Sequence, residues 1–246
     1  MPTKLVVMFH FKNFSLYHEN SALKIGTDAV LLAAATPVQQ VTSVLDIGCG
    51  CGVIALCLAW KMKQQNGSQS IIGIDIDESS ILEAQKNLNG FPKNAQQDIQ
   101  FLRQSIQGFS NEYQGKFDLI VSNPPFFVDS LKPNSYKKSV SKHNDTLPFE
   151  ELIQAVTRLL APKGKFYLIL PKNEHDVFHQ LAQRQWTETF RLSIKPTPQK
   201  TVNRIISAYQ KCPSCELHFS ELVIRTENNT YTSEYQDLTK EFYLDF

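Results

Sequence analysis

From residue 41 onward, short apolar runs alternate with amphipathic runs of helical period, and this alternation constrains the fold more than any other feature. It is typical of a parallel sheet with crossover helices packed against it, which predicts an α/β fold. The expected parallel strands are Val41–Ile47, Ser70–Asp75, Ile99–Leu102, Phe117–Val121 and Lys165–Leu170. The expected helices are Val53–Met62, Glu78–Leu88 (with Ile81, Leu82, Ala84 and Leu88 facing inward), Phe149–Leu160 and Glu174–Gln185.

The sequence of the last third of the chain predicts the final strands of the sheet and the helices around them. The helix that begins at Phe149 should stop at Ala161–Gly164, because proline and glycine break helices. Thr189–Ile194 and Arg204–Tyr209 are expected to form an antiparallel closing hairpin, which gives a mostly parallel sheet of seven strands. A further strand and a short helix complete the chain: Leu217–Ile224 and Tyr235–Phe242.

The first forty residues precede this core and predict a small appendage packed on it. A short β element is expected around five apolar residues: Phe9, Phe11, Phe14, Leu16 and Tyr17. Ala29–Ala35 reads as a helix capped by Thr27 or Asp28. Because this segment is too short to fold alone, we expect one domain, with an appendage over residues 1–40, a core over 41–210, and a C-terminal strand and helix over 211–246.

Composition limits the class of protein. The 246 residues, 42% hydrophobic and 20% charged, fit an ordinary soluble globular protein. The apolar run Leu5–Phe9 is too short for a signal peptide or a membrane span, so we expect a cytoplasmic protein without membrane contact. A net charge of +1 excludes a general attraction of the whole molecule to nucleic acid, so any such attraction must be local.

The cysteines and histidines do not predict a metal site. Five cysteines do not indicate a disulfide framework, and Cys212 and Cys215 lack the second pair that a zinc site needs. A turn containing Pro213 is the favoured interpretation of that pair. His175 and His179 are four apart on an expected helix with no third ligand in the pattern, which favours a solvated helix face.

The motif Asn123-Pro124-Pro125-Phe126 follows the fourth expected strand directly. It should lie at the carboxyl end of that strand, where ligands bind in open α/β sheets. The motif offers a side-chain amide, a rigid backbone and an aromatic face, which suit a planar ligand with an NH2 group. It does not separate adenine, guanine and the glutamine amide, and the plain alternative is an Asn-Pro turn that ends a strand.

A glycine-rich turn, from Asp46 to Gly52, joins the first expected strand to its helix. Its spacing is G-x-G-x-G with an acid two residues earlier, not the G-x-G-x-x-G of dinucleotide enzymes. Asp75 ends the second strand, where a carboxylate can accept both hydroxyls of a ribose, and Asp46 can face an ammonium group. A tight turn alone would explain the glycines. The glycine-rich turn, Asp75 and the Asn-Pro-Pro-Phe motif together, however, predict a cofactor without pyrophosphate.

On these motifs the chain resembles the class I S-adenosylmethionine-dependent methyltransferases, which have a Rossmann-like fold, over most of residues 41–210. The resemblance implies S-adenosyl-L-methionine as the cofactor, with its methionine part near Asp46, Gly48, Gly50 and Gly52, and its ribose on Asp75. Relatives often carry an acid after the third strand that accepts the cofactor's adenine amine. The matching residue here is Ser105, whose hydroxyl can also accept a hydrogen bond.

Both ends of the chain are similar to one bacterial family, which methylates the N6 amine of adenine 37 in the anticodon loop of valine tRNA. The similar segments are Phe9–Lys12, Leu23–Leu32, Glu221–Arg225 and Tyr231–Tyr235, the last running on to Phe242–Leu244. This resemblance implies that Gly26, Thr27 and Asp28 close over the cofactor, although as plain sequence they could be only a helix cap. Relatives usually have Tyr where this chain has Phe126, which removes a hydroxyl and keeps the stacking face.

The expected chemistry rests on three residues of the motif. If the Asn123 side-chain oxygen and the Pro124 carbonyl each accept one N–H of an adenine amine, its nitrogen can pyramidalise and expose its lone pair. Asn123 would then also lie beside the cofactor, and Phe126 would stack on the base. Because the cofactor already carries an activated methyl group, no metal and no nucleophilic residue is required.

Two basic stretches without an acid, Ser130–Asn144 and Phe190–Lys211, read as surface loops. Solvated loops would explain their charge, but their positions beside the expected site favour phosphate contact. The expected RNA-binding residues are Lys132, Lys137, Lys138, Lys142, Lys195, Lys200 and Arg204. The expected partner is tRNA. The sequence does not define the oligomeric state, and a monomer is the simplest expectation.

Three alternatives remain open. A glutamine-N5 methyltransferase of release factors shares the Asn-Pro-Pro motif but carries a helical domain before the core, and the 45 residues before Asp46 do not read as a helical bundle. Many guanine-N2 rRNA methyltransferases carry an additional domain that the pattern here lacks. A catalytically silent RNA-binding relative is disfavoured by intact Asp46, Asp75 and Asn123.

Overall fold

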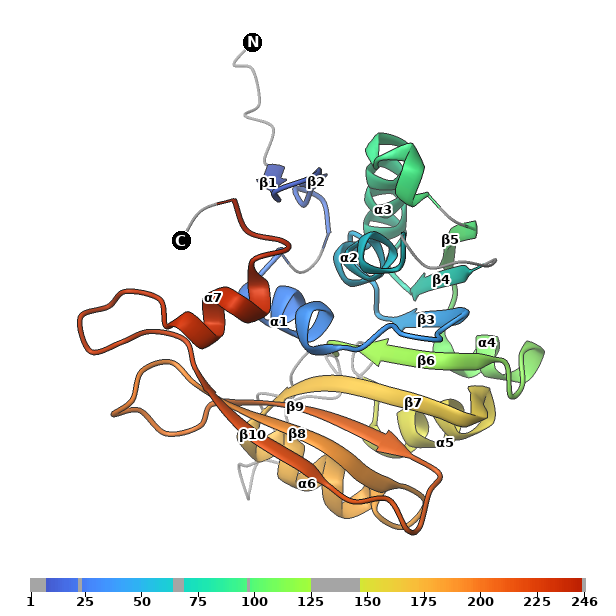
Figure 1. Ribbon diagram of the computed structural model, residues 1–246. Coiled ribbons are helices and arrows are strands. Elements are labelled where there is room, and N and C mark those ends of the chain that lie inside the picture. Colours follow the sequence, from blue (N-terminus) through green and yellow to red (C-terminus); the bar gives the residue numbers. More distant parts are fainter. Residues whose placement is uncertain (1–7, 22–23, 64–68, 97, 125–146, 245–246) are drawn as a thin grey trace, which may run out of the picture.

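The computed structural model describes residues 8–21, 24–63, 69–96, 98–124 and 147–244 (Figure 1). Within them, eight strands form one sheet in the order β10-β8-β9-β7-β6-β3-β4-β5. Their bounds are β3 Ser43–Ile47, β4 Ser70–Asp75, β5 Asp98–Arg103, β6 Phe117–Ser122, β7 Leu160–Pro171, β8 Thr187–Lys195, β9 Arg204–Gln210 and β10 His218–Val223. A separate antiparallel pair consists of β1 Met8–His10 and β2 Ser15–Tyr17.

Strands β3 to β7 run parallel, whereas β9 is antiparallel to both of its neighbours, β7 and β8. The predicted mostly parallel α/β sheet with an antiparallel closing pair is therefore confirmed. The predicted number of seven strands was wrong, because β10 pairs in parallel with β8 and extends the sheet to eight. One edge of the sheet thus carries the carboxyl ends of β3 to β8 and β10, together with the amino end of β9.

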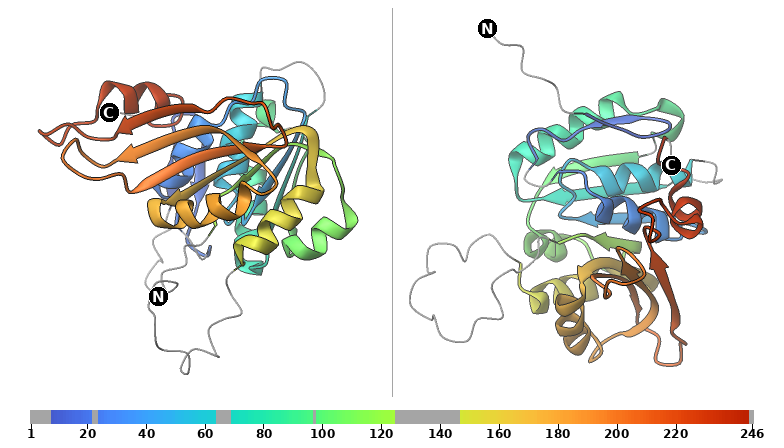
Figure 2. Two further views of the ribbon diagram at one scale, coloured as in Figure 1. Left: turned by 90° about the horizontal axis from the view of Figure 1, so that it is seen from below. Right: turned by 90° about the vertical axis from the view of Figure 1, so that its left-hand side faces the viewer.

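Helices cover both faces of the sheet (Figure 2). Their bounds are α1 Thr27–Ala35, α2 Val53–Met62, α3 Glu78–Gly90, α4 Ile106–Glu112, α5 Phe149–Leu159, α6 Lys172–Ala182 and α7 Ser233–Thr239, with a short 3-10 turn at Lys93–Ala95. Side chains alternate across a strand, so that Val44 enters the core cluster of α1, α2, α3 and α7, and Leu45 that of α4, α5 and α6. None of these helices combines the length and apolar character of a membrane span.

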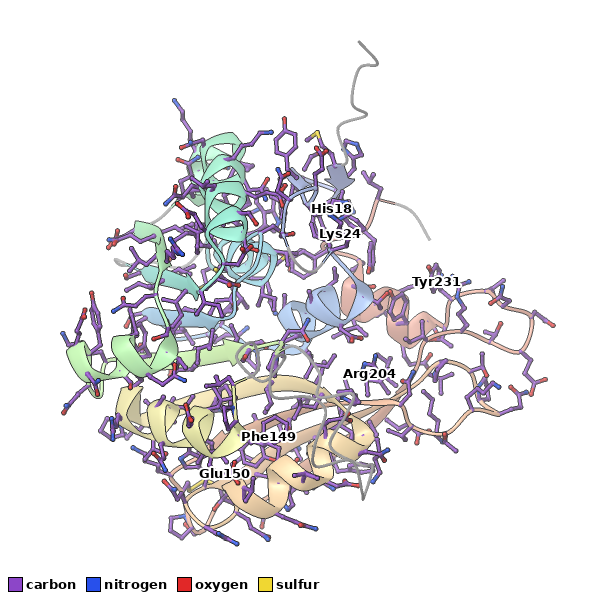
Figure 3. The ribbon with its side chains drawn as sticks, turned by 180° about the vertical axis from the view of Figure 1, so that it is seen from behind. His18, Lys24, Phe149, Glu150, Arg204 and Tyr231 are labelled. Atoms are coloured by element: carbon purple, nitrogen blue, oxygen red, sulfur yellow. A yellow bond between two sulfur atoms is a disulfide. The ribbon has the colours of Figure 1, made fainter. Side chains whose placement is uncertain are left out.

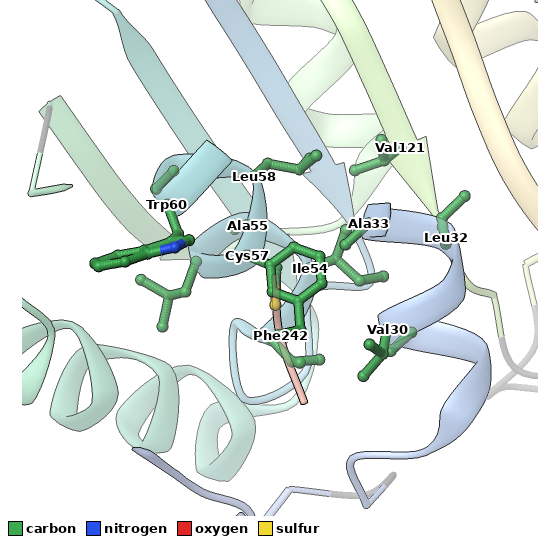
Figure 4. Packing of buried hydrophobic residues seen from close by; sticks show 14 of the residues in the cluster. Val30, Leu32, Ala33, Ile54, Ala55, Cys57, Leu58, Trp60, Val121 and Phe242 are labelled. Carbon is green, nitrogen blue, oxygen red and sulfur yellow. The ribbon is translucent and has the colours of Figure 1, made fainter. Parts of the chain in front are cut away.

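Helix α2 is buried almost throughout, from Val53 to Trp60. It lies between the sheet, α1 and the C-terminal segment, which brings Phe242 into the same apolar cluster (Figure 4). Phe242 also accepts a hydrogen bond from the backbone N–H of Lys12, at 2.7 Å. The N-terminal and C-terminal segments therefore pack on each other over the first face of the sheet.

Two local predictions were wrong, and a third was right about the end of a helix but not about the start of the next strand. Leu82 is 60% exposed, because it follows the inward Ile81 by one residue and a helix turns by about 100° per residue. Helix α1 begins at Thr27 with Gly26 as its N-cap, so neither Thr27 nor Asp28 caps it, and the structure shows no side-chain cap there. Ala161–Gly164 does follow the end of α5, but it belongs to β7, where an irregularity in the pairing with β6 accommodates it.

Candidate functional site

Three neighbouring strands bring the predicted site residues to one place. Ile47 at the end of β3 pairs with Ile74 of β4 on one side and with Ser122 of β6 on the other. The residues that follow these three are Gly48, Asp75 and Asn123. They therefore meet at the carboxyl edge of the sheet, on the central strands, as expected from the sequence.

The glycine-rich turn has a left-handed backbone at Gly48, Gly50 and Gly52, with φ of 69°, 54° and 83°. At Gly52 a Cβ would lie 2.7 Å from Cζ of Phe101, so this glycine is required by packing. At Gly50 a Cβ would meet nothing within 4 Å. The turn therefore packs tightly against the protein at its end and leaves open space before it, which a ligand can approach closely.

Asp75 fastens this turn to the end of β4. Its Oδ2 accepts a hydrogen bond from the backbone N–H of Gly50 at 2.9 Å, and its Oδ1 accepts one from Asp77 at 2.9 Å. A carboxylate oxygen has a further lone pair after accepting one hydrogen bond. Asp75 can therefore hold the turn and still accept hydroxyl groups of a ligand.

Asp46 is a fully buried carboxyl group. Its Oδ2 accepts a hydrogen bond from the backbone N–H of Ala55 at 3.1 Å, and its Oδ1 has no hydrogen-bond partner among the described residues. Burial raises the pKa of Asp46 to about 7; the bond from Ala55 opposes this rise, and the negative charge of Asp75 adds to it. Asp46 is thus prepared for a cationic ligand group, which would favour its ionised form.

Asn123 presents the second unsatisfied acceptor. Its Oδ1 is buried and has no hydrogen-bond partner in the described part of the chain. The preceding residue, Ser122, is fixed by a hydrogen bond from its Oγ to the carbonyl of Ile47 at 3.0 Å, and Pro124 is buried. A buried polar atom without a partner costs about 1–3 kcal/mol, so Asn123 is a place where the N–H of a ligand would complete the structure.

The remaining predicted site residues are distributed unevenly. Phe126, Lys132, Lys137, Lys138 and Lys142 lie outside the described residues. Ser105 follows β5 and caps α4, where its Oγ accepts a hydrogen bond from the backbone N–H of Gly108 at 3.2 Å. Gly26 to Asp28 open α1, and Asp28 forms an ion pair with Arg204, with Nε and Oδ2 2.8 Å apart.

The second basic stretch is not one surface loop, contrary to the prediction. Most of it forms β8 and β9, and only residues 196–203 connect them. Lys195, Lys200 and Arg204 lie at the same edge of the sheet as Asn123. Lys195 pairs with Glu221, with 2.9 Å between Nζ and Oε1. Lys211 lies at the opposite edge, where it donates to the carbonyl of Thr157. Only the middle of the stretch is therefore placed to meet a ligand at the site.

The cysteine and histidine predictions need correction. Cys212 and Cys215 form a disulfide, within the predicted turn at Pro213. His175 is buried rather than solvated, because Glu188 of β8 covers it, with Nε2 and Oε1 3.1 Å apart. The described residues contain no cluster of His, Cys, Asp and Glu that could hold a metal ion.

Sequence reasoning missed Arg225, Tyr231 and Tyr235 as candidates at this edge. They line a cavity next to Thr27, and the rings of the two tyrosines stack with their centroids 5.0 Å apart. These residues lie in the segments Glu221–Arg225 and Tyr231–Tyr235 that resemble the tRNA-methylating family, but two tyrosines four residues apart by themselves indicate no ligand.

Comparison with known proteins agrees with this geometry. The profile of the methyltransferase domain family matches residues 39–231. The chain is 36% identical over 239 residues to the tRNA1(Val) (adenine(37)-N6)-methyltransferase of Flavobacterium johnsoniae, which covers 96% of this chain and 99% of that protein. It is also 36% identical over 242 residues to a protein of the same name from Bacteroides fragilis, covering 96% and 97%.

Solved structures show the same fold at low identity. A predicted O-methyltransferase from Agrobacterium tumefaciens has a TM-score of 0.69 at 17% identity, covering 87% of this chain and 96% of that chain. A protein from Clostridium thermocellum that is described as an rRNA methylase has a TM-score of 0.53 at 16% identity. The match covers 77% of this chain and 100% of that chain. The chain therefore belongs to the class I S-adenosylmethionine-dependent methyltransferases and, within them, to the family of the tRNA1(Val) (adenine(37)-N6)-methyltransferases.

Proposed function

We propose that this protein methylates the exocyclic N6 amine of an adenine in tRNA, with S-adenosylmethionine as the methyl donor, and that the target is adenine 37 of valine tRNA. The observation that carries the proposal is the buried Oδ1 of Asn123, which has no partner among the described residues and lies at the same sheet edge as the glycine-rich turn. The names of the relatives support the choice of tRNA and of the nucleotide.

The residues at this edge fit the cofactor. The open space beside Gly50 admits a ligand to the backbone of the turn. The unpartnered Oδ1 of Asp46 suits the ammonium group of the methionine part, and the carboxylate of Asp75 suits the ribose hydroxyls. When bound, S-adenosylmethionine supplies a methyl group that its sulfonium has already activated.

Asn123 and Pro124 act on the amine of the substrate. The lone pair of this nitrogen is conjugated into the adenine ring, which makes the amine a weak nucleophile. Two acceptors, Oδ1 of Asn123 and the carbonyl of Pro124, hold its two protons and favour a pyramidal nitrogen with an exposed lone pair. Transfer would break the bond between the methyl carbon and the sulfonium sulfur as the N–C bond forms, and the nitrogen would then lose one of its two protons to water. Catalysis then rests on positioning by a rigid strand end rather than on a covalent intermediate.

The target base must leave its stack to reach this edge. That costs least in a single-stranded loop, which agrees with a nucleotide in an anticodon loop. Lys200 is exposed and lies between β8 and β9, beside the same edge. Phosphate groups next to the target would meet it there.

The direct test is to incubate the protein with labelled S-adenosylmethionine and unmodified valine tRNA, and then to map the methylated nucleoside. N6-methyladenine at position 37 is the expected product, and a tRNA with guanine at this position is the matched control. Label that appears in guanine or only in a protein substrate would contradict the proposal.

Cofactor affinity should depend on pH through Asp46. When the pH is below the Asp46 pKa of about 7, this carboxyl group is mostly protonated in the free protein. It then offers no negative charge to the ammonium group. We expect S-adenosylmethionine to bind roughly tenfold more weakly at pH 6 than at pH 7.5. Calorimetry in two buffers of different ionisation enthalpy should show proton release on binding at pH 6. Asp46→Asn should bind weakly at both pH values, and an equal dependence on pH in this variant would contradict the assignment.

Binding of tRNA should weaken with added salt, partly through Lys200. Loss of one phosphate contact reduces the slope of log affinity against log salt by about 0.7–0.9. We expect Lys200→Glu to lower both the affinity and this slope. Lys116 is also exposed but precedes β6, at the opposite edge, so Lys116→Glu is the matched control. Equal salt slopes for the two variants in filter binding would show that Lys200 does not face RNA.

A further inference from the structure

Two neighbouring cavities lie beside the N-terminus of α1, outside the group of Asp46, Asp75 and Asn123. The first has a volume of about 360 Å³, within the range of roughly 300–1,000 Å³ for small-molecule sites, and Phe9, Tyr231, Tyr235 and Tyr243 are among its walls. The second, of about 300 Å³, adds Arg204 and Arg225. Both contain Thr27, Tyr231 and Tyr235, so they are two parts of one depression, which we call the tyrosine subsite.

The aromatic walls of the tyrosine subsite form a series of rings. Tyr231 stacks with Tyr235 at 5.0 Å and 18°, and Tyr235 lies 6.2 Å from Tyr243. The guanidinium of Arg225 lies over the ring of Tyr231, 4.1 Å from its centroid, and also donates to its hydroxyl at 3.0 Å. A short antiparallel bridge between Arg225 and Tyr231 fixes their relative position. The planar groups are therefore held in place before any ligand arrives.

The tyrosine subsite lies at the carboxyl edge of the sheet. Its walls include Ile194 at the end of β8, Arg204 at the start of β9 and Ile224 after β10. Asn123 follows β6 at this same edge. Figure 3 shows Tyr231 and Arg204 on one side of the molecule. A chain of nucleotides bound at Asn123 can continue toward the tyrosines without crossing the sheet.

The charge of the second cavity suits a phosphate. Its charged walls are Arg204 and Arg225 against Asp28, which gives two positive charges and one negative charge, a net +1. The Asp28 carboxylate is already bound to Arg204. Planar guanidinium and aromatic groups beside a positive charge are the features with which proteins hold unpaired nucleotides.

We propose that the tyrosine subsite binds a nucleotide next to the target adenine in an unpaired RNA loop, with the base against Tyr231 and Tyr243, which the buried Tyr235 supports from behind, and the phosphate near Arg204 and Arg225. The proposal rests on the proposed function, because it assumes an RNA substrate. The protein would then bind the RNA loop at two places, so that extrusion of the target base is coupled to binding of the adjacent nucleotide.

The test uses the full chain and a synthetic RNA stem-loop with the anticodon arm of valine tRNA. Tyr231→Leu removes one ring and should weaken binding of this RNA about tenfold, since stacking of one base contributes roughly 1–3 kcal/mol. Tyr231→Phe keeps the ring and should bind nearly as wild type. Arg225→Lys keeps the positive charge but loses the planar guanidinium. It should therefore weaken RNA binding while the slope of log affinity against log salt stays unchanged. Affinity for S-adenosylmethionine should be the same in all three variants.

A measurement on the wild-type protein guards against a variant that fails to fold. With 5-bromouridine next to the target nucleotide, ultraviolet light should crosslink the RNA to Tyr231 or Tyr243, which are half-buried, and not to the buried Tyr235. Crosslinks at other residues, or full RNA affinity in folded Tyr231→Leu, would overturn the subsite while methylation of tRNA still supports the function. A variant that loses cofactor affinity instead of RNA affinity would also overturn it. If the wild-type protein neither binds nor methylates the RNA, the proposed function fails first.

Discussion

Asn123→Ala should lower the turnover of tRNA methylation by about 10²-fold or more, while the affinity for S-adenosylmethionine stays the same. Removal of one preorganised acceptor from a water-excluded site has an effect of this size, because no solvent molecule replaces it in the right place. The Oδ1 of Asn123 is buried and lacks a partner among the described residues, so its loss removes an acceptor that only a ligand uses. Single-turnover methylation of valine tRNA measures the chemical step directly.

Ser122→Ala is the matched control for Asn123→Ala. Ser122 is the buried neighbour at the same strand end, and its Oγ donates to the carbonyl of Ile47. The control removes a buried polar group from the same strand end and leaves the Asn123 amide in place, so its turnover should stay within a few fold of wild type. Turnover near wild type in Asn123→Ala would refute the proposed role of the amide.

Glu188→Ala should lower the free energy of unfolding by about 3 kcal/mol, the low end of the range for breaking a buried ion pair. Glu188 of β8 is buried and serves three partners at once. Its Oε1 lies 3.1 Å from Nε2 of His175 and accepts from Nε of Arg191 at 3.0 Å, and its Oε2 lies 3.5 Å from Nδ1 of His179. These contacts join α6 to the closing strands, and urea unfolding followed by circular dichroism measures their loss.

Glu221→Ala is the control for this prediction. Glu221 pairs with Lys195 near the surface, and exposed pairs contribute no more than about 1 kcal/mol. We therefore expect a much smaller change than in Glu188→Ala. Equal losses in the two variants would show that burial of Glu188 adds nothing to its contribution.

The effect of Glu188→Ala should also depend on pH. Burial alone would raise the pKa of Glu188, but the hydrogen bonds and charges of His175 and Arg191 outweigh it and hold this pKa below its usual value. Its contribution to stability is therefore present above pH 4.5 and is lost as the pH falls through the lowered pKa. The difference between wild type and Glu188→Ala should shrink in the same acidic range.

His179 adds to the sensitivity to acid. Burial lowers the pKa of His179, the charge of Glu188 opposes this, and His175 and Arg191 lower it further. Below pH 6.5 the unfolded chain then takes up a proton more readily than the folded chain. The free energy of unfolding of the wild type should therefore begin to fall as the pH decreases below this value.

Much of the core could be predicted from the sequence because its elements are set by local patterns. The bounds of α2 and β4 are those expected, since each is an apolar run between clear glycine or polar breaks. The glycine-rich turn and the ends of β4 and β6 were placed at one edge by the rule for parallel sheets alone. The eighth strand was not anticipated in the sheet, because pairing of β10 with β8 depends on contacts between distant segments.

The errors have a common physical origin in long-range contacts. His175 lies on a helix with polar neighbours, and only Glu188, thirteen residues later on a strand, explains its burial. Charge alone suggested that Arg204 contacts RNA; the structure adds its pairing with Asp28 of α1, a contact between distant segments, and its contact with RNA stays a prediction. The roles of Asp75, Asn123 and Ser105 toward the cofactor and substrate remain predictions, and Asn123→Ala tests that of Asn123.

The ion pair of Asp28 with Arg204 has a consequence for the order of events during synthesis. It joins residues 176 positions apart, and a ribosome adds about 5–20 residues per second. The first helix therefore waits roughly 10–35 s for its partner. Strands β3 to β6 and helices α2 and α3 leave the ribosome during this interval, so the turn for the methyl donor can form early. The three tyrosines of the proposed subsite, Tyr231, Tyr235 and Tyr243, leave the ribosome after this core, so capture of a nucleotide there would follow formation of the turn.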